Sequence, residues 1–303
     1  MRSRGRSKAA PTKPARRGPG DPLGALGLLL YLVCAVVPMA AAFGYAVAYS
    51  LGLTGLLSEG LTLRAWTRAL TDPATWHSFA LSLAIAAATV VLSAAAGMLL
   101  ALVLGHRLAR GPLSYVAYTP LALPFTVAAF VVFQWLTPSG LLARAALRAG
   151  LIESLDGFVP LVNDPFGIGI LVTHVLIAAP FLALVFQRLM VQERVPELQQ
   201  LAATLGASRL QTLARVTAPL LVRRGASNLA LIFVVVLGSY EVPLLLGRQA
   251  PQMLSVLIMR KYGRFDIEDK PEAFALAALY TAVVVAGLAL VFRAREGSHA
   301  SGR

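Results

Sequence analysis

Long runs of apolar residues, separated by shorter segments rich in charged and turn-forming residues, recur along the whole chain. A helix of about 20 residues crosses roughly 30 Å of hydrocarbon, and six of the runs reach that length. They lie near residues 24–50, 79–105, 114–137, 167–189, 227–246 and 273–292. The pattern predicts an all-α membrane protein with six transmembrane helices. Pro120 and Pro124 predict a kink or an interruption in the third run.

The first apolar run follows seven Lys and Arg residues, an arrangement that also opens secretory signal peptides. With nearly 27 residues, this run exceeds the roughly 7–15 residue apolar core of a signal peptide, so we expect a retained transmembrane helix. Residues 1–23 show no apolar periodicity and are expected to form a disordered basic tail. The rest of the chain predicts one membrane domain, residues 24–295, and a second tail, residues 296–303. Both tails are expected in the cytoplasm.

Composition and charge agree with this topology. The 303 residues are 57% hydrophobic and 14% charged, and the mean hydropathy is +0.72. With both termini inside, the inner segments hold 18 of the 27 Lys and Arg residues, and nine acidic residues balance the nine outer ones. An excess of Lys and Arg is typical of cytoplasmic loops. The net charge of +13 is therefore explained without nucleic acid, and we expect the basic tail to face anionic membrane lipid.

The outer segments contain short helical patterns. Residues 63–72 and 141–150 carry Leu, Ala and Trp at helical spacing, and residues 253–259 are apolar but too short to span, so all three are expected at the outer surface. Four aromatic residues are expected at headgroup depth: Trp66, Trp76, Tyr262 and Phe265. The only cysteine, Cys34, excludes an intramolecular disulfide and is expected to be a small buried side chain.

The longest inner segment, residues 190–226, carries the signals of two helices rather than those of a flexible loop. Pro196 suits the first turn of one helix, and Gly206 is a natural C-terminal stop. Ser208 can cap a second helix that runs toward Pro219. The sequence predicts a helix–turn–helix along the inner membrane surface.

The two faces of the second predicted helix differ. One face carries the apolar residues Leu210, Leu213, Val216 and Leu220, and the other carries Ser208, Gln211 and Arg215. The corner between the helices is built from small residues, which allow close approach either by the protein's own spans or by another protein. Because the polar face projects where lipid cannot satisfy it, we favour an external partner.

This segment resembles the EAA loop of the membrane subunits of ATP-binding-cassette (ABC) importers. In that family Glu-Ala-Ala is followed by three residues, by Gly, and about a dozen residues later by Leu-Pro. The aligned residues here are Gln200-Leu201-Ala202, Gly206 and Ala218-Pro219, so that Gln replaces the Glu of the motif. The six-span order and the position of the loop between the fourth and fifth spans are also similar. The resemblance covers residues 25–295.

The resemblance implies a cytoplasmic coupling helix that docks into a groove on a separate ABC ATPase subunit, where ATP is bound and hydrolysed. The chain itself contains no GxxxxGK[ST] phosphate loop, and we expect it to carry no cofactor, no metal and no catalytic residue. The residues expected to dock on the ATPase are Glu197, Gln200, Ala202, Ala203, Gly206, Ala207, Ser208 and Arg209. The resemblance further implies a second permease subunit, identical or homologous, an extracytoplasmic solute-binding protein, and a place in the bacterial inner membrane.

The fifth run contains an ionisable residue, which is costly in a membrane and therefore a candidate for function. The stretch VVVLGSYEVPLLLG places Glu241 in the outer half of the run, after Ser239 and Tyr240 and before Pro243. Two interpretations remain open. Glu241 either lines a solute pathway, where the loosened backbone faces a cavity, or it lies near the interface and pairs with Arg248.

Two other polar residues lie within the spans. Gln134 is a candidate for the solute pathway, and we expect His174 to be a hydrogen-bonded packing residue. The LGSYEVPLLLG stretch is similar to the corresponding segment of polyamine, iron and thiamine importer permeases. A carboxylate in the pathway favours a cationic solute, so we expect a small cation such as a polyamine.

Besides an importer permease, two other classes of protein fit the same pattern. One is a membrane scaffold whose inner segment recruits a cytosolic partner, and the other is an ion-coupled secondary transporter. An intramembrane enzyme is not favoured, because the sequence has neither an HExxH zinc helix nor a GxSxG nucleophile turn.

Overall fold

The computed structural model of the chain describes residues 22–55, 58, 60–109 and 112–300. Within those ranges the regular structure is entirely helical, which confirms the predicted all-α class for the described part of the chain. The basic tail expected over residues 1–23 lies almost wholly outside the described residues.

Six helical stretches among the described residues are long and apolar enough to cross a membrane, as the sequence predicts. They are Gly24–Ser50, Pro73–Gly105, Phe125–Arg148, Ile168–Gln192, Arg209–Leu237 and Asp269–Ala289. The first, second, fourth and sixth stretches overlap closely with the expected runs. The third and fifth differ, because in each the helix breaks inside the expected run.

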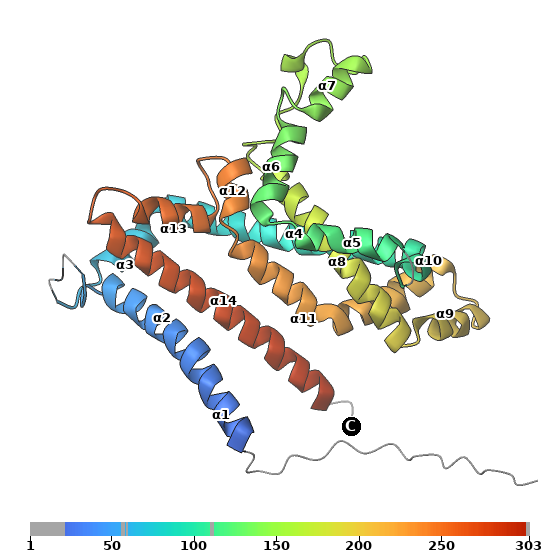
Figure 1. The fold of residues 1–303 in the computed structure, drawn as a ribbon, viewed down its shortest axis with the longest axis horizontal. Helices are drawn as coiled ribbons and strands as arrows, with labels where there is room; N and C mark the ends of the chain where they lie inside the picture. The colour runs from blue at the N-terminus through green and yellow to red at the C-terminus, as the bar shows by residue number, and fades with distance from the viewer. Residues whose placement is uncertain (1–21, 56–57, 59, 110–111, 301–303) are drawn as a thin grey trace, which may run out of the picture.

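The helices follow one another along the chain as shown in Figure 1. The N-terminal half contains α1 (Pro22–Tyr31), a π-helical turn (Leu32–Val36), α2 (Val37–Ser50), α3 (Arg64–Thr71), α4 (Pro73–Ala109), α5 (Pro112–Ala122), α6 (Phe125–Leu136) and α7 (Leu141–Arg148). After a short 3₁₀ turn (Leu155–Gly157) follow α8 (Ile168–Gln192), α9 (Val195–Thr204), α10 (Arg209–Thr212), a second π-helical turn (Leu213–Thr217), α11 (Ala218–Leu237), α12 (Glu241–Leu246), α13 (Leu254–Tyr262) and α14 (Asp269–Ala300). The short helices predicted in the outer segments are present as α3, α7 and α13.

The third expected run is divided between two helices. α5 ends at Ala122 and α6 begins at Phe125, so the interruption predicted from the prolines is confirmed. Pro124 directly precedes α6, where its missing N–H is no loss, and its ring prevents α5 from continuing. The expectation of one span over 114–137 is therefore wrong. The stretch long enough to cross the membrane is Phe125–Arg148, which contains α6 and α7.

The fifth expected run is displaced toward the N-terminus. α10, the π-helical turn and α11 form one continuous helix, Arg209–Leu237, in place of the expected run 227–246. Pro219 was expected near the end of a separate surface helix. It lies instead at the start of α11, directly after the π-helical turn, where its missing N–H is easily accommodated. The helix then breaks at residues 238–240 before α12.

The contact between α4 and α8 is central to the bundle. Four small buried residues recur at helical spacing along α4: Ala86, Thr89, Ser93 and Gly97. A Cβ atom on Gly97 would lie 2.8 Å from the Cβ of Leu182 and 2.9 Å from the carbonyl oxygen of Ala179, both on α8. The glycine therefore allows the two backbones to approach closely, as small residues commonly do between membrane helices.

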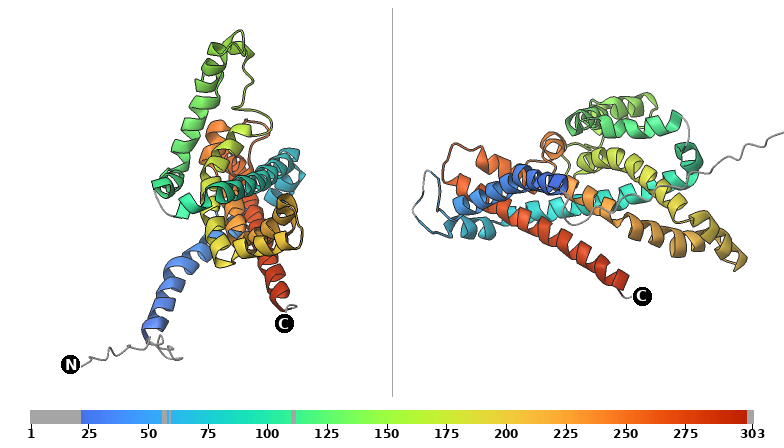
Figure 2. Two further views of the ribbon diagram at one scale, coloured as in Figure 1. Left: turned by 90° about the vertical axis from the view of Figure 1, so that its right-hand side faces the viewer. Right: turned by 60° about the horizontal axis from the view of Figure 1, so that its bottom comes forward.

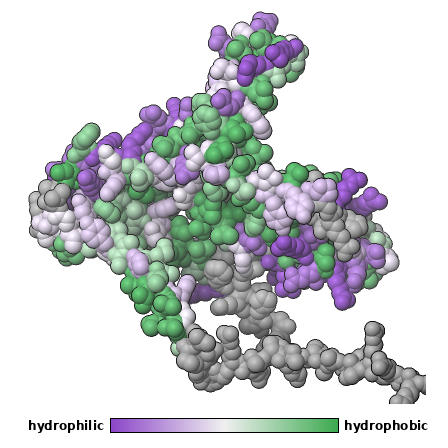
Figure 3. All heavy atoms as spheres, viewed as in Figure 1, coloured by the Kyte–Doolittle hydropathy of each residue, from purple (hydrophilic) through white to green (hydrophobic). Residues whose placement is uncertain are grey.

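The two ends of the molecule carry different elements (Figure 1). α9 and α10 lie at one end of α8 and α11, whereas α3 and α13 lie at the other end of the molecule. The arm formed by α6 and α7 projects from the helical body (Figures 1 and 2). Apolar side chains cover much of the body, and hydrophilic side chains gather over the end that carries α9 and α10 (Figure 3).

The first span lies at the edge of the bundle, where α2 packs along α14. Its apolar window has no buried residue. Cys34, expected to be buried, is exposed for this reason.

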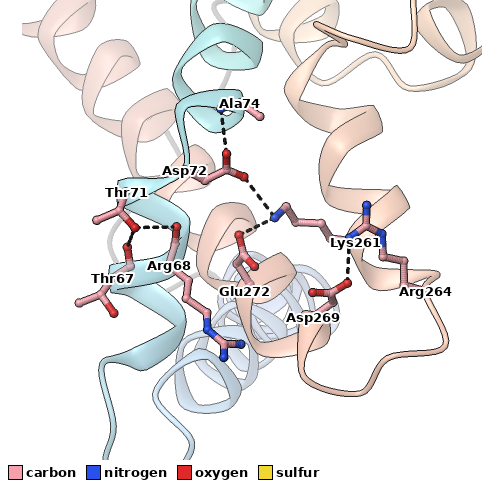
Figure 4. Close-up of polar contacts among 9 residues, drawn as sticks. All are labelled: Thr67, Arg68, Thr71, Asp72, Ala74, Lys261, Arg264, Asp269 and Glu272. Atoms are coloured by element: carbon pink, nitrogen blue, oxygen red, sulfur yellow. Dashed lines mark hydrogen bonds and ion pairs between the residues drawn. The ribbon is translucent and has the colours of Figure 1, made fainter.

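Buried charges join α3, α13 and α14 (Figure 4). Nζ of Lys261 on α13 lies 2.5 Å from Oε1 of Glu272 on α14 and 3.5 Å from Oδ2 of Asp72, which follows α3. Lys261 and Glu272 are both buried. An exposed ion pair nearby, Arg264 with Asp269 at 3.0 Å, joins the end of α13 to the start of α14. These ion pairs hold α13 against its neighbours. The helix is also too short to span a membrane.

Replacing Lys261 by Met should destabilise the protein, because it leaves the buried Glu272 carboxylate without its partner. Breaking one side of a buried ion pair costs about 3 kcal/mol or more. Arg264→Met removes an exposed charge and should cost less than about 1 kcal/mol. Thermal unfolding of both variants in detergent tests this prediction, and equal unfolding midpoints would contradict it.

Candidate functional site

The elbow, defined here as residues 193–217, begins with α9. Pro196 lies in its first turn, as predicted. The helix ends in a Schellman motif: the N–H of Gly206 donates to Ala203 O at 3.0 Å, and the N–H of Ala207 donates to Ala202 O at 3.0 Å. Gly206 has a φ of +82°, a conformation that favours glycine, so the predicted C-terminal stop is confirmed.

The second part of the elbow begins with a capping box. Ser208 Oγ accepts from the backbone N–H of Gln211 at 3.2 Å, and Gln211 Oε1 accepts from the N–H of Ser208 at 2.9 Å. The predicted cap is therefore confirmed. On the predicted apolar face, the Leu210 side chain is 74% exposed, whereas Leu213, Val216 and Leu220 are partly buried. The buried residues of this stretch are Thr212 and Thr217.

Side-chain contacts fix the elbow to the spans. Gln199 Nε2 donates to Thr217 Oγ1 at 3.0 Å and so ties α9 to the helix that continues as α11. An ion pair between Glu193 and Arg224, at 3.1 Å, joins the end of α8 to α11. Val195, at the start of α9, is fully buried. These contacts hold α9 rigidly relative to both spans.

The eight docking candidates all lie on this elbow, and four of them line a cavity of about 530 Å³: Gln200, Ala203, Ala207 and Arg209. The cavity lies between α9, α10 and Leu102 of α4. The other four surround the same corner: Glu197, Ala202, Gly206 and Ser208. Glu197 pairs with Arg194 at 3.9 Å, an exposed contact.

The surface around this cavity also carries exposed leucines. Leu201 is 58% exposed and Leu205 is 80% exposed, and Leu210 adds a third exposed side chain at the start of α10. Exposed apolar side chains next to a hollow, on an otherwise hydrophilic end, are typical of a protein interface. The elbow is therefore suited to bind a protein partner.

The second candidate region lies where α11 breaks. Ser239 and Tyr240 occupy the break, and Glu241 begins α12. The carbonyl oxygen of Ser239, freed from the helix ladder, accepts from Ser255 Oγ at 2.6 Å. The Glu241 side chain is exposed, and its Oε2 accepts a hydrogen bond from the hydroxyl of Thr126 on α6. The pairing with Arg248 considered from the sequence is not formed between these two described residues.

A pocket of about 240 Å³ lies beside this break, between α12 and α13. Its polar lining includes Tyr240, Arg248, Gln249, Gln252 and Arg260. Arg260 donates two long hydrogen bonds to Gln249, at 3.3 Å to its side chain and 3.4 Å to its carbonyl oxygen. Two positive side chains, Arg248 and Arg260, therefore line a pocket that Tyr240, the residue before Glu241, also lines.

Two sequence candidates lie apart from Glu241. Gln134 is exposed and lies eight residues after Thr126 on α6, which corresponds to roughly 12 Å along the helix. His174 is buried, and its Nδ1 lies 2.8 Å from the carbonyl oxygen of Ile170, so the expected hydrogen-bonded packing role is confirmed. Thr126 was not found from the sequence. Its position directly after the Pro124 break was the available signal.

Comparison with protein families matches residues 93–296 to a model described as a binding-protein-dependent transport system inner membrane component. A search of the curated proteins finds no significant match. Among solved structures, the chain is similar to a bacterial alginate ABC transporter in complex with an alginate pentasaccharide-bound periplasmic protein, with 17% identity and a TM-score of 0.64 over 89% of this chain and 91% of that one. It is also similar to a bacterial ABC transporter involved in the import of the acidic polysaccharide alginate, with 19% identity and a TM-score of 0.64 over 91% and 94% of the two chains.

Proposed function

The chain belongs to the family of binding-protein-dependent transport system inner membrane components, and on that premise we propose that it forms half of the translocation path for a small solute. It is a multi-pass inner-membrane permease subunit of an ABC importer and not an enzyme. Membership of this family argues against the non-transporting scaffold and the ion-coupled secondary transporter. In the proposal, ATP is bound by a separate ATPase subunit.

The elbow is the proposed docking site for that ATPase. The observation that carries the proposal is the continuous helix Arg209–Leu237, the fifth spanning stretch, whose first residues are also part of the elbow. Because Gln199 ties α9 to the same helix, a displacement of the elbow moves α11 directly. Gln200 replaces the Glu of the family motif and lines the cavity without a charge, whereas Arg209 lines the same cavity and supplies a cation.

The other partners follow from the same assignment. One six-span subunit supplies half of a pathway, so a second permease subunit, identical or homologous, completes it. A solute-binding protein delivers the solute to the end that carries α3 and α13. The start of α1 and the end of α14 lie at the ends of their spans away from α3 (Figure 1), which supports cytoplasmic placement of both termini. The exposed first span provides a surface for lipid or for the second subunit.

The proposed solute is a small organic cation such as a polyamine. Glu241 supports this choice, because its exposed carboxylate lies at a helix break and pairs with a neutral hydroxyl rather than with Arg248. Interrupted helices often line the pathways of transporters.

A second class of solute has its own support. Arg248 and Arg260 line the neighbouring pocket, and neither forms an ion pair with a carboxylate in the described part of the chain. The two similar solved transporters act on alginate, which one of their titles calls an acidic polysaccharide. An anionic solute is therefore the alternative to the cation.

Substituting Ala203 by Trp should abolish association with the ATPase, because the new ring fills the cavity of the elbow. Ala203 lies in a regular part of α9, so the change adds no backbone strain. Thr204→Trp is the matched control, since Thr204 is exposed on the same helix and does not line the cavity. ATPase copurification and ATP hydrolysis are measured from solubilised membranes. Full copurification of Ala203→Trp would overturn the docking assignment.

Substituting Glu241 by Gln should raise the KM for spermidine uptake about tenfold or more, because one charged contact of about 1.5–3 kcal/mol is lost. Assembly with the partner subunits should remain intact. Uptake of labelled spermidine is measured in cells that lack other polyamine importers. Unchanged kinetics would return Glu241 to a structural role, and loss of uptake on substituting Arg248 or Arg260 would favour the anionic solute.

A further inference from the structure

Two interrupted helices meet at one point of the fold. The first interruption separates α5 from α6 at residues 123–124, and the second separates α11 from α12 at residues 238–240. Thr126, in the first turn of α6, donates its hydroxyl hydrogen to Glu241, the first residue of α12. The two residues are 115 positions apart in the sequence. The contact therefore joins the two breaks directly.

The electrostatic state of Glu241 differs from that of the other paired glutamates. Each of these four glutamates contacts an Arg or Lys side chain: Glu193, Glu197, Glu268 and Glu272. Glu241 forms no ion pair with a described Lys or Arg, and its described partner is a neutral hydroxyl. A hydroxyl donor orients a carboxylate without cancelling its charge. One oxygen, Oε2, is held by Thr126, and the other remains available on an exposed side chain.

Each partner lies next to a residue that packs into the helical body. The ring of Phe125, next to Thr126, packs against the buried His174 of α8 with ring centroids 6.0 Å apart. Val242, next to Glu241, is fully buried. Packed neighbours of this kind fix the geometry of a binding site on rigid elements.

We propose that Thr126 is the positioning residue of a cation-binding site, in which Glu241 receives a primary ammonium group of an organic cation. The hydroxyl holds the carboxylate in one orientation, with its second oxygen directed to the ligand. This inference rests on the proposed function as a permease for a cationic solute. It adds that Thr126 sets the affinity of Glu241 for that solute. Without the hydroxyl, the carboxylate keeps its charge but is free to rotate.

The test is calorimetric titration of the purified full-length chain with spermidine. Thr126→Val has the shape of Thr but lacks the donor, and should weaken the Kd about tenfold, the effect of losing one hydrogen bond to a charged group. Thr126→Ser restores the donor and should bind within about twofold of the native chain. Glu241→Gln removes the charge itself and should weaken the Kd about tenfold or more. Asp156→Asn, which changes an exposed outer acid, serves as the control for non-specific attraction of the cation.

The outcomes separate this inference from the proposed function. If Glu241→Gln weakens binding while Thr126→Val binds like the native chain, the positioning role is overturned and the cation pathway stands. If the native chain does not bind spermidine, or Glu241→Gln binds it equally well, both are overturned. Equal weakening in Thr126→Ser and Thr126→Val would indicate a packing role and also overturn the inference. Should Thr126→Val fail to fold, Thr126→Ala removes the donor without added bulk.

Discussion

Hydrocarbon offers no hydrogen-bond partner to a backbone, so every peptide group within a span must be satisfied by the protein itself. This constraint explains why the fold is helical. It also explains why the helix breaks are few, and why the backbone groups at each break are satisfied in another way. The break before α12 frees the carbonyl of Ser239, and Ser255 satisfies it from α13. The break before α6 falls at Pro124, which has no N–H to satisfy. The contact between Thr126 and Glu241 then joins the two breaks.

The same helical continuity gives the molecule a mechanical connection between its two ends. The helix Arg209–Leu237 runs from the elbow to the second break, so one element connects the proposed docking surface to the break that precedes Glu241. Close packing of α4 on α8 at Gly97, and the polar tie of Gln199 to Thr217, leave little freedom for the elbow to move alone. A partner that displaces the elbow therefore acts on the region around Glu241, which is the requirement for ATP-driven alternating access.

Charged residues at the two places differ in whether they form ion pairs. At the end that carries α3 and α13, Lys261 is buried between two carboxylates and secures α13. Near the second break, Glu241 and Arg248 carry charges that no described ion pair neutralises. The buried charges at Lys261 stabilise the fold, whereas the exposed charges near the break belong to the proposed solute site.

The amino-acid pattern alone predicted the interruption at Pro124, the stop at Gly206 and the cap at Ser208, since each depends on signals within one or two helical turns. It also predicted the number of spans from their apolar length, but the bounds of the third and fifth spans were wrong. The His174 contact is equally local, four residues away along α8. The packing of the helices was needed to establish that the second elbow helix continues through Pro219, that Glu241 meets Thr126 rather than Arg248, and that Lys261 lies between Asp72 and Glu272. Such partners are distant in sequence, and which of them meet depends on which helices pack side by side, a choice set by the whole bundle rather than by any local pattern.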